Sequence, residues 1–162
     1  MKKPKKKTKI KILVLIISFA VVFAVAYTGS ILTTPAIKSG WYESIKPSIT
    51  PPNQVFSVVW TILFFLMALS LYFAWTNAKT IKIKNQIAIV FGLNFFYNIA
   101  WSAVFFGIKD IALAFYDIIL LWISIILLIM ITLKISKKSA YLLIPYLLWV
   151  SFAIILNYLS IT

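Results

Sequence analysis

The sequence contains no cysteine and no histidine, and every basic side chain in it is a lysine. The absence of cysteine excludes disulfides and thiolate nucleophiles. The absence of both residue types removes the usual ligands for zinc and for haem iron. We therefore predict no metal site and no required cofactor, and no hydrolytic or nucleotide-binding motif supplies catalytic residues either.

Acidic side chains are also scarce, since three Asp or Glu residues face sixteen lysines and leave a formal net charge of +13. A charge of this size is compatible with nucleic-acid binding. The lysines, however, are concentrated at the ends of apolar runs, where anionic lipid headgroups are the expected partners. We therefore expect contact with membrane lipid and no binding of nucleic acid.

What the chain has in excess is apolar residues, which make up 63% of it, against about 45–50% in soluble domains. Five runs are almost free of charge, and each exceeds the roughly 20 residues that a helix needs to cross a ~30 Å hydrocarbon core. They are residues 12–32, 55–78, 86–108, 111–133 and 139–161. Backbone groups in lipid need internal partners, so these runs predict helices. Short connections predict antiparallel neighbours, and hence an all-α integral membrane protein built as one five-helix bundle.

Lysine placement predicts how the bundle is oriented. Thirteen of the sixteen lysines lie in the N-terminal tail and in the second and fourth connections, which share one side of a five-span protein. The other side has only Lys38, Lys46 and Lys109. The positive-inside rule therefore places the N-terminus in the cytoplasm and the C-terminus outside. We expect residues 1–11 to form a basic, disordered cytoplasmic tail ahead of a membrane domain at 12–162.

The basic start followed by an apolar run is also compatible with a cleavable signal peptide, with Ala24-Val25-Ala26 as the cleavage site. The apolar run continues past this site to Leu32, which is long for the hydrophobic region of such a peptide. A retained first helix is therefore the favoured interpretation.

The longest polar break, residues 41–60, separates the first two apolar runs and holds three of the six prolines. Proline fixes φ and disfavours helix at the preceding residue, so Lys46-Pro47 and Thr50-Pro51 predict ordered, non-helical chain. A stiff loop over the end of a bundle, with tryptophans at its root, is what a lid over a binding cavity requires. We therefore predict a ligand cavity under the loop between the first two helices.

The third apolar run carries a stripe of polar and aromatic residues. Asn94, Asn98, Trp101 and Phe105 recur at helical spacing and so lie on one face. Amides on a membrane helix are expected to point into the bundle or a cavity, because lipid has no partners for them. Two interpretations stay open for the amides. One is hydrogen bonding between helices, which contributes about 0.6–2 kcal/mol per contact, and the other is contact with a ligand.

Asp117 is the one ionisable residue well inside an apolar run. An uncompensated carboxylate there is costly, so Asp117 is expected to be protonated or paired. Because the chain has no arginine or histidine, the expected partners are amides, hydroxyls or water. It is either a proton-linked or ligand-contacting group, or a neutral acid that ties two helices together.

Six tryptophans are a prominent feature of the chain. Trp60, Trp101 and Trp149 come from three different predicted helices, whereas Trp75 and Trp41 suit the role of interface anchors. Three indoles that converge in a bundle would offer flat apolar walls, each with one N–H donor. Such walls suit a planar aromatic ligand.

Four segments, taken in order, resemble the translocator protein family (TspO/MBR, also called tryptophan-rich sensory protein or peripheral-type benzodiazepine receptor). They are WYESIKPSITPPNQVFSVVW at 41–60, LNFFYNIAWSAVFFG at 93–107, LAFYDIILLW at 113–122 and PYLLWVSFAIILNY at 145–158. The resemblance implies a five-helix bundle with a cavity under the first loop, often as a homodimer. It also implies binding of tetrapyrroles such as protoporphyrin IX and of drug-like hydrophobic molecules.

The resemblance further implies which residues bind ligand. Tyr42 and Pro51 match positions of the lid, and seven others match positions that line the cavity. These seven are Trp60, Asn98, Trp101, Asp117, Ile118, Trp149 and Ala153. Two departures are evident: Ile49 stands where the family often has tryptophan, and no basic residue follows Tyr158, so the sterol-binding pattern is absent.

Three functional hypotheses follow. The leading one is a receptor or carrier in a bacterial or archaeal cell membrane, which binds a porphyrin as ligand with its carboxylates near Lys38 and Lys46. The second, which the resemblance implies for some bacterial relatives, is light-dependent degradation of protoporphyrin that uses Trp60 and Trp149. The third is a structural or assembly protein without a saturable ligand, packed through small residues.

Overall fold

The computed structural model describes residues 4–161, and this part of the chain is helical apart from short connections. Seven α-helices and one π-helix, η1, follow one another in it. In chain order they are α1 (Pro4–Lys38), α2 (Trp41–Ile45), α3 (Asn53–Asn77), α4 (Ile81–Ser102), η1 (Ala103–Ile108), α5 (Ile111–Leu133), α6 (Lys137–Tyr141) and α7 (Ile144–Leu159).

Five stretches of the described chain are helical, long and apolar enough to cross a membrane. They are Thr8–Lys38, Asn53–Asn77, Ile81–Ile108, Ile111–Leu133 and Lys137–Leu159. The predicted five-span, all-α integral membrane protein is therefore confirmed. The fourth stretch has the predicted bounds, and the others differ from prediction by a few residues at their ends.

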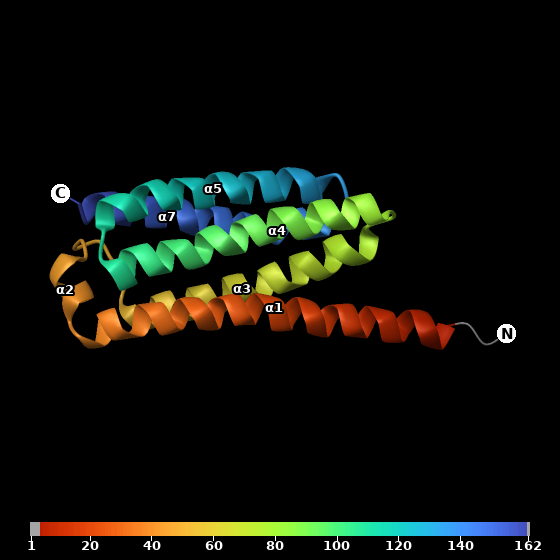
Figure 1. The fold of residues 1–162 in the computed structure, drawn as a ribbon, viewed down its shortest axis with the longest axis horizontal. Helices are drawn as coiled ribbons and strands as arrows, with labels where there is room; N and C mark the ends of the chain where they lie inside the picture. Colours follow the sequence, from red (N-terminus) through yellow and green to blue (C-terminus); the bar gives the residue numbers. More distant parts are fainter. Residues whose placement is uncertain (1–3, 162) are drawn as a thin grey trace.

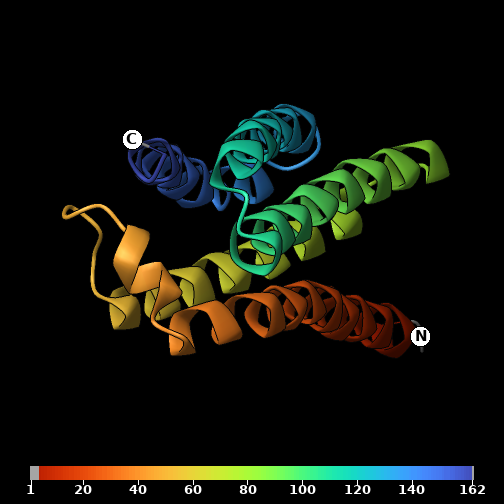
Figure 2. The same ribbon diagram turned by 60° about the vertical axis from the view of Figure 1, so that its left-hand side comes forward.

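The long helices run side by side along one axis, and the two ends of the chain lie at opposite ends of the bundle (Figure 1). Helix α1 packs along α3, and α5 packs between α4 and α7. The short helix α2 lies across one end of the bundle, the end that also carries the C-terminus (Figures 1 and 2). We call this the lid end.

The first helix is longer than its apolar run. α1 begins at Pro4, so residues 4–11 are helical and the expectation of a disordered tail was wrong for them. Extending an existing helix adds one hydrogen bond per residue and needs no new nucleus, and lysine is a good helix former. Residues 1–3 lie outside the described part of the chain.

At its other end α1 continues through Pro35, which removes one backbone donor from the helix. Residues 39–52 connect α1 to α3, and we call this connection the lid; the predicted lid stretch, residues 41–60, extends into α3. The connection is non-helical at Pro47, Pro51 and Pro52, as predicted. It also contains the short helix α2, which the sequence pattern did not predict. Gly40 adopts the left-handed conformation, with φ 75°, that lets the chain reverse direction before α2.

Two irregularities interrupt the later spans. The third span ends in η1, a π-helix, and π-helices are frequent at functional sites. Asp110 then caps α5, because its Oδ1 accepts a hydrogen bond from Leu113 N at 2.9 Å. The fifth span is divided into α6 and α7, and Pro145 stands in the first turn of α7, where its missing N–H costs nothing.

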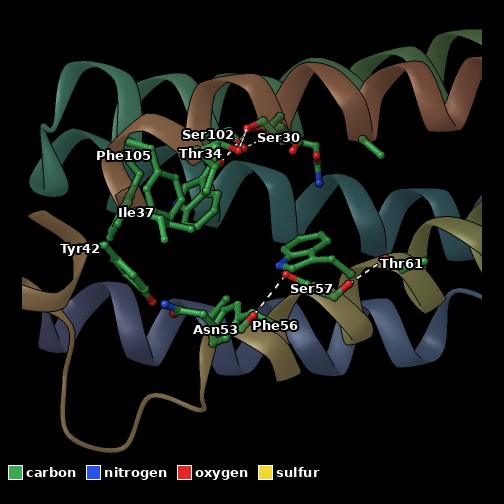
Figure 3. Close-up of a pocket in the computed structure, with 18 of the residues that line it drawn as sticks. Ser30, Thr34, Ile37, Tyr42, Asn53, Phe56, Ser57, Thr61, Ser102 and Phe105 are labelled. Carbon is green, nitrogen blue, oxygen red and sulfur yellow. Dashed lines mark hydrogen bonds between the residues drawn. The ribbon is translucent and has the colours of Figure 1, made fainter. Parts of the chain in front are cut away.

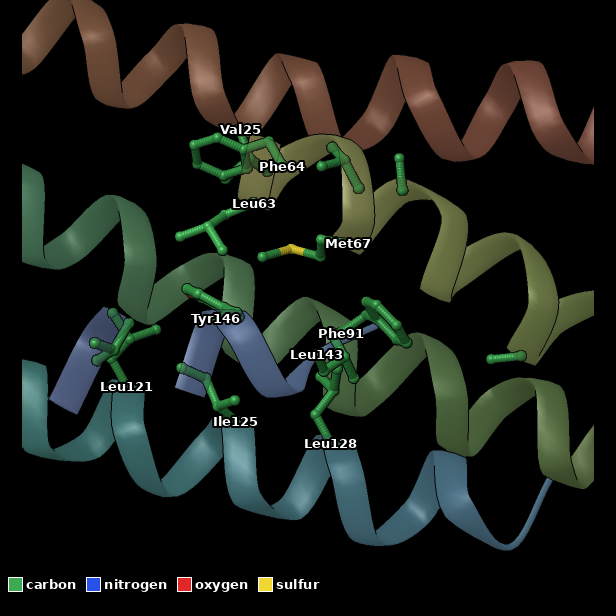
Figure 4. Close-up of a cluster of buried hydrophobic side chains, with 14 of the residues drawn as sticks. Val25, Leu63, Phe64, Met67, Phe91, Leu121, Ile125, Leu128, Leu143 and Tyr146 are labelled. Atoms are coloured by element: carbon green, nitrogen blue, oxygen red, sulfur yellow. The ribbon is translucent and has the colours of Figure 1, made fainter. Parts of the chain in front are cut away.

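Figure 4 shows the larger apolar core, whose buried side chains come mainly from the parts of the long helices away from the lid. Met67, Phe91, Ile125 and Tyr146 come from four helices, Leu143 comes from the turn before α7, and each is at most 1% exposed. A second, smaller apolar cluster packs the lid against η1.

Candidate functional site

A cavity of about 650 Å³ lies under the lid, between α1, α3, α4 with η1, and α7 (Figure 3). Ligand pockets typically enclose ~300–1,000 Å³ and combine apolar walls with a few polar groups. Nine of the lining residues are aromatic: Phe23, Tyr27, Tyr42, Phe56, Trp60, Phe64, Trp101, Phe105 and Phe106. The polar groups are hydroxyls and amides, and no charged residue is among the described residues that line it.

Two indoles form part of the aromatic wall, and they differ in how their N–H groups are used. Trp101 stacks on Phe105 with ring centroids 5.1 Å apart, and its Nε1 donates to Asn157 Oδ1 at 3.0 Å. Trp60 lies against Phe64 at 5.6 Å, and among the described residues its N–H has no hydrogen-bond partner. The Trp60 donor is therefore free for a ligand.

The lid is fastened to the start of α3 by a carboxylate. Asn53 Nδ2 donates to Glu43 Oε1 at 3.0 Å, and Lys46 pairs with the other oxygen at 2.5 Å. Hydrogen bonds from Lys46 and Asn53 hold the pKa of Glu43 below its usual value. The positive charge of Lys46 is thus already paired with Glu43. Lys38, which lines a neighbouring groove on α1, has no ion pair in the described structure.

Aromatic contacts fasten the other side of the lid to η1. Tyr42 packs edge-on against Phe106 with ring centroids 5.5 Å apart, and Trp41 packs edge-on against Phe105 with ring centroids 5.9 Å apart. Lys109 places its ammonium 5.3 Å from the centre of the Trp41 ring, a cation–π contact. Burial, followed by the nearby charge of Glu43, raises the pKa of Tyr42 to about 12. This phenol is therefore neutral at ordinary pH.

The two amides of α4 both take part in bonds between helices. Asn98 Nδ2 donates to the Tyr146 hydroxyl at 3.0 Å, and that hydroxyl donates to Asn94 Oδ1 at 3.5 Å. Asn94 Nδ2 in turn donates to Ser124 Oγ at 2.9 Å. Of the two interpretations, hydrogen bonding between helices therefore holds for both amides. Asn98 also lines the cavity.

Five of the nine residues that the sequence singled out line this cavity, and four do not. The five are Tyr42, Trp60, Asn98, Trp101 and Ala153. Their contact with a ligand stays a prediction. Their convergence from α2, α3, α4 and α7 agrees with the expected location under the loop between the first two long helices.

The other four lie elsewhere. Ile118 is 1% exposed and belongs to the core, and Pro51 lies in the lid without facing the cavity. Asp117 is half-buried on α5, which supplies none of the described lining residues, and its Oδ2 has no hydrogen-bond partner in the described chain. No amide or hydroxyl group among the described residues pairs with this carboxylate, so the predicted side-chain partners are not found.

Trp149 does not join the other two indoles at the cavity surface. Its ring packs edge-on against Phe56 at 5.2 Å, and Phe56 is the side chain that lines the cavity. The Trp149 Nε1 is buried without a partner among the described residues. Of the three indoles expected in the cavity wall, two therefore line it, and Trp149 lies behind Phe56.

Sequence reasoning missed several lining residues, among them one amide and a set of hydroxyl residues. The amide is Asn157 of α7, which accepts from Trp101 and donates to Ile111 O at 3.0 Å. It is an amide inside an apolar run, so the lack of hydrogen-bond partners in lipid predicts an inward position for it, as for Asn94 and Asn98. The hydroxyl residues lie on α1, namely Ser30, Thr33 and Thr34.

Comparison with known proteins identifies relatives over most of the chain. Residues 18–161 match the sequence model of the TspO/MBR family. The tryptophan-rich protein TspO of Chlorobaculum tepidum is 38% identical over 155 residues, covering 91% of this chain and 94% of the relative. The protein of that name from Archaeoglobus fulgidus is 39% identical over 150 residues, with the same coverage. The human translocator protein is 30% identical over 120 residues, 73% of this chain and 71% of its own length.

Proposed function

Because the chain belongs to the TspO/MBR family, we propose that it is a membrane receptor or carrier that binds tetrapyrroles of the protoporphyrin IX type in the cavity under the lid. The names of its relatives, tryptophan-rich sensory protein and translocator protein among them, support a sensory or binding role in a membrane. The observation that carries the tetrapyrrole proposal is the uncharged, aromatic-walled cavity of about 650 Å³.

The aromatic wall favours a flat conjugated ring. Trp60 presents a ring face and an unused N–H donor, and Trp101 with Phe105 presents a second aromatic surface. Aromatic pairs contribute ~0.5–1.5 kcal/mol beyond their buried area. The ring belongs inside the cavity and its carboxylates at the rim, because no lining residue can neutralise them and burying an unpaired charge is costly.

The rim offers one suitable cation. Lys38 borders a shallow groove on α1 that shares Tyr27, Ser30 and Thr34 with the cavity. Lys46, which the sequence analysis also proposed as a partner for the carboxylates, is paired with Glu43. We therefore propose Lys38 as the main contact for a carboxylate of the bound ring.

Titration in lipid nanodiscs tests this proposal. Protoporphyrin IX should quench the tryptophan fluorescence of the protein saturably. Trp60→Ala should weaken binding about tenfold, as expected for losing an aromatic contact and its burial. Trp75→Ala is the matched control, because Trp75 lies near the opposite end of α3 and outside the cavity lining. Non-saturable quenching of the wild-type protein would rule out this function.

Light-dependent degradation of the bound porphyrin is the second candidate. The observation that favours it is the Trp60 indole, which lines the cavity and is therefore available as an electron donor to an excited ring. Illumination of the complex should then convert the porphyrin spectrum to that of a distinct product. Bleaching at the same slow rate in wild type and Trp60→Phe would leave a binding protein only.

A further inference from the structure

We infer that ligands enter the cavity sideways from the lipid, through an opening between α1 and α3. The opening admits uncharged amphipathic molecules, and of a charged molecule it admits the uncharged part. The opening follows from side-chain exposure and from the chemistry of the lining residues. It rests on the proposed function only for the choice of protoporphyrin IX as probe.

Exposure of the lining residues identifies the open side. Those from α4 and α7 are shielded, with Asn98 and Ala153 5% and 6% exposed and Asn157 2% exposed. The lining residues that are exposed lie on α1 and α3. They are Phe23, Tyr27, Ser30, Thr34, Gln54, Ser57 and Thr61. Figure 3 shows Ser30 and Thr34 across the space from Ser57 and Thr61.

The opening has clear limits along the two helices. At its inner end α1 and α3 close on one another, because Phe19 packs edge-on against Phe65 with ring centroids 5.2 Å apart. At the other end the lid is fastened to α3 through Glu43 and Asn53. Between these limits, Tyr27 to Thr34 covers roughly two helical turns, or about 10 Å. Both helices belong here to stretches that are long and apolar enough to cross a membrane, and we therefore place the opening at the lipid.

Hydroxyl groups border the opening on both sides. Thr34 Oγ1 donates to Ser30 O at 2.7 Å, and Thr61 Oγ1 donates to Ser57 O at 2.7 Å. Because these protons are bound within their own helices, the oxygens present free lone pairs to a passing molecule. The border therefore accepts N–H and O–H donors, such as pyrrole N–H groups, and offers nothing to a lipid tail.

Charge sets a second condition for entry. The lining contains no ionisable cation or anion among the described residues. An ionised group crossing it would lose its hydration without compensation. On α1 the lining residues Tyr27, Ser30 and Thr34 continue onto the outer groove that ends at Lys38. A carboxylate can stay at Lys38, near the membrane surface, while the uncharged part of the molecule moves between the helices.

Blocking substitutions test the opening. Ser30→Phe and Thr61→Phe narrow it from either side, and Thr28→Phe and Ile62→Phe are matched controls. Thr28 and Ile62 are exposed neighbours on the same helices that do not line the cavity. In stopped-flow fluorescence with membrane-dissolved protoporphyrin IX, the blocking variants should slow association and dissociation together by about tenfold, equivalent to a barrier raised by about 1.4 kcal/mol. The controls should keep wild-type rates.

A cross-linked lid tests the competing route from water. The natural chain has no cysteine, so Glu43→Cys with Asn53→Cys can be joined specifically by a short bismaleimide. Entry from lipid predicts unchanged rates after cross-linking. Slower binding with the cross-linked lid, together with wild-type rates in both phenylalanine variants, would overturn the inference.

A probe that needs no porphyrin separates this inference from the proposed function. Lipids with brominated acyl chains quench indoles that they approach, and Trp60 is the indole behind the opening. The contribution of Trp60 to this quenching is the part that Trp60→Phe removes. This contribution should be smaller in the Ser30→Phe and Thr61→Phe backgrounds and unchanged in the two control backgrounds. Equal quenching of Trp60 in blocking and control variants would refute the opening. Absent porphyrin saturation with normal lipid quenching would refute only the tetrapyrrole ligand.

Discussion

Asn98 Nδ2 donates a hydrogen bond to the Tyr146 hydroxyl at 3.0 Å and so joins α4 to α7 directly below the cavity. Tyr146 is 1% exposed, and the same hydroxyl reaches Asn94, so one phenol orients two amides. Asn98 is therefore held in place on one side while it faces the cavity on the other. Pre-organisation of this kind fixes a polar group before a ligand arrives.

Tyr146→Phe should destabilise the protein by about 1–3 kcal/mol, because the buried Asn98 Nδ2 loses its acceptor and Asn94 Oδ1 loses its donor. Thermal unfolding in detergent measures the loss. Tyr116→Phe is the control, since Tyr116 is 66% exposed on α5. Equal unfolding temperatures for the two variants would mean that the hydroxyl does not hold the amides.

Trp101→Phe and Trp60→Phe should differ in their effect on stability. The first leaves Asn157 Oδ1 without its donor, which costs about 1–3 kcal/mol. The second removes an N–H that has no partner in the described structure, so its stability cost should be smaller. Unfolding in detergent gives the comparison. A larger loss for Trp60→Phe would contradict the assigned hydrogen bonds.

Trp149→Ala should weaken protoporphyrin binding less than Trp60→Ala does. Trp60 lines the cavity, whereas Trp149 acts on it only through Phe56. Fluorescence titration of the two variants, with porphyrin emission as the readout, measures the difference. If both substitutions cost the same affinity, the ligand reaches Trp149, and the bound cavity is larger than the one described.

The lid should loosen in acid. Hydrogen bonds from Lys46 and Asn53 lower the pKa of Glu43 in the folded protein. A lowered pKa stabilises the fold at pH values above the ordinary glutamate value, and this contribution is lost as the pH falls through the lowered value. Hydrogen exchange of residues 39–52 should therefore increase in acid, relative to the rest of the chain.

Glu43→Gln gives the matched comparison for the acid effect. It removes the charge, so the lid of this variant should exchange faster than wild type at neutral pH and show no further acid step. The ratio of exchange rates in the two proteins, taken at each pH, removes the intrinsic pH dependence of exchange. A constant ratio across the range would show that Glu43 does not fasten the lid.

The sequence alone determined the number and type of the spans and the place of the lid. A run of about 20 apolar residues is a local property, and lipid permits only internally bonded helices across it. The prolines at Pro47 and Pro51 likewise act on their own neighbourhood. The same physics made Asn94 and Asn98 point inward, because lipid offers an amide no partner.

Tertiary structure decided which inward residues share the cavity. Trp60, Trp149 and Asp117 all lie inside spans, yet only Trp60 lines the cavity. In a membrane the lipid-facing and bundle-facing sides of a helix are both apolar, so the pattern along the chain does not fix the rotation of each helix. Packing fixes it instead: α1 meets α4 closely at Gly29, where a Cβ would lie 3.3 Å from Ser102 Oγ. Such contacts between distant residues set the helix rotations, and with them the opening between α1 and α3.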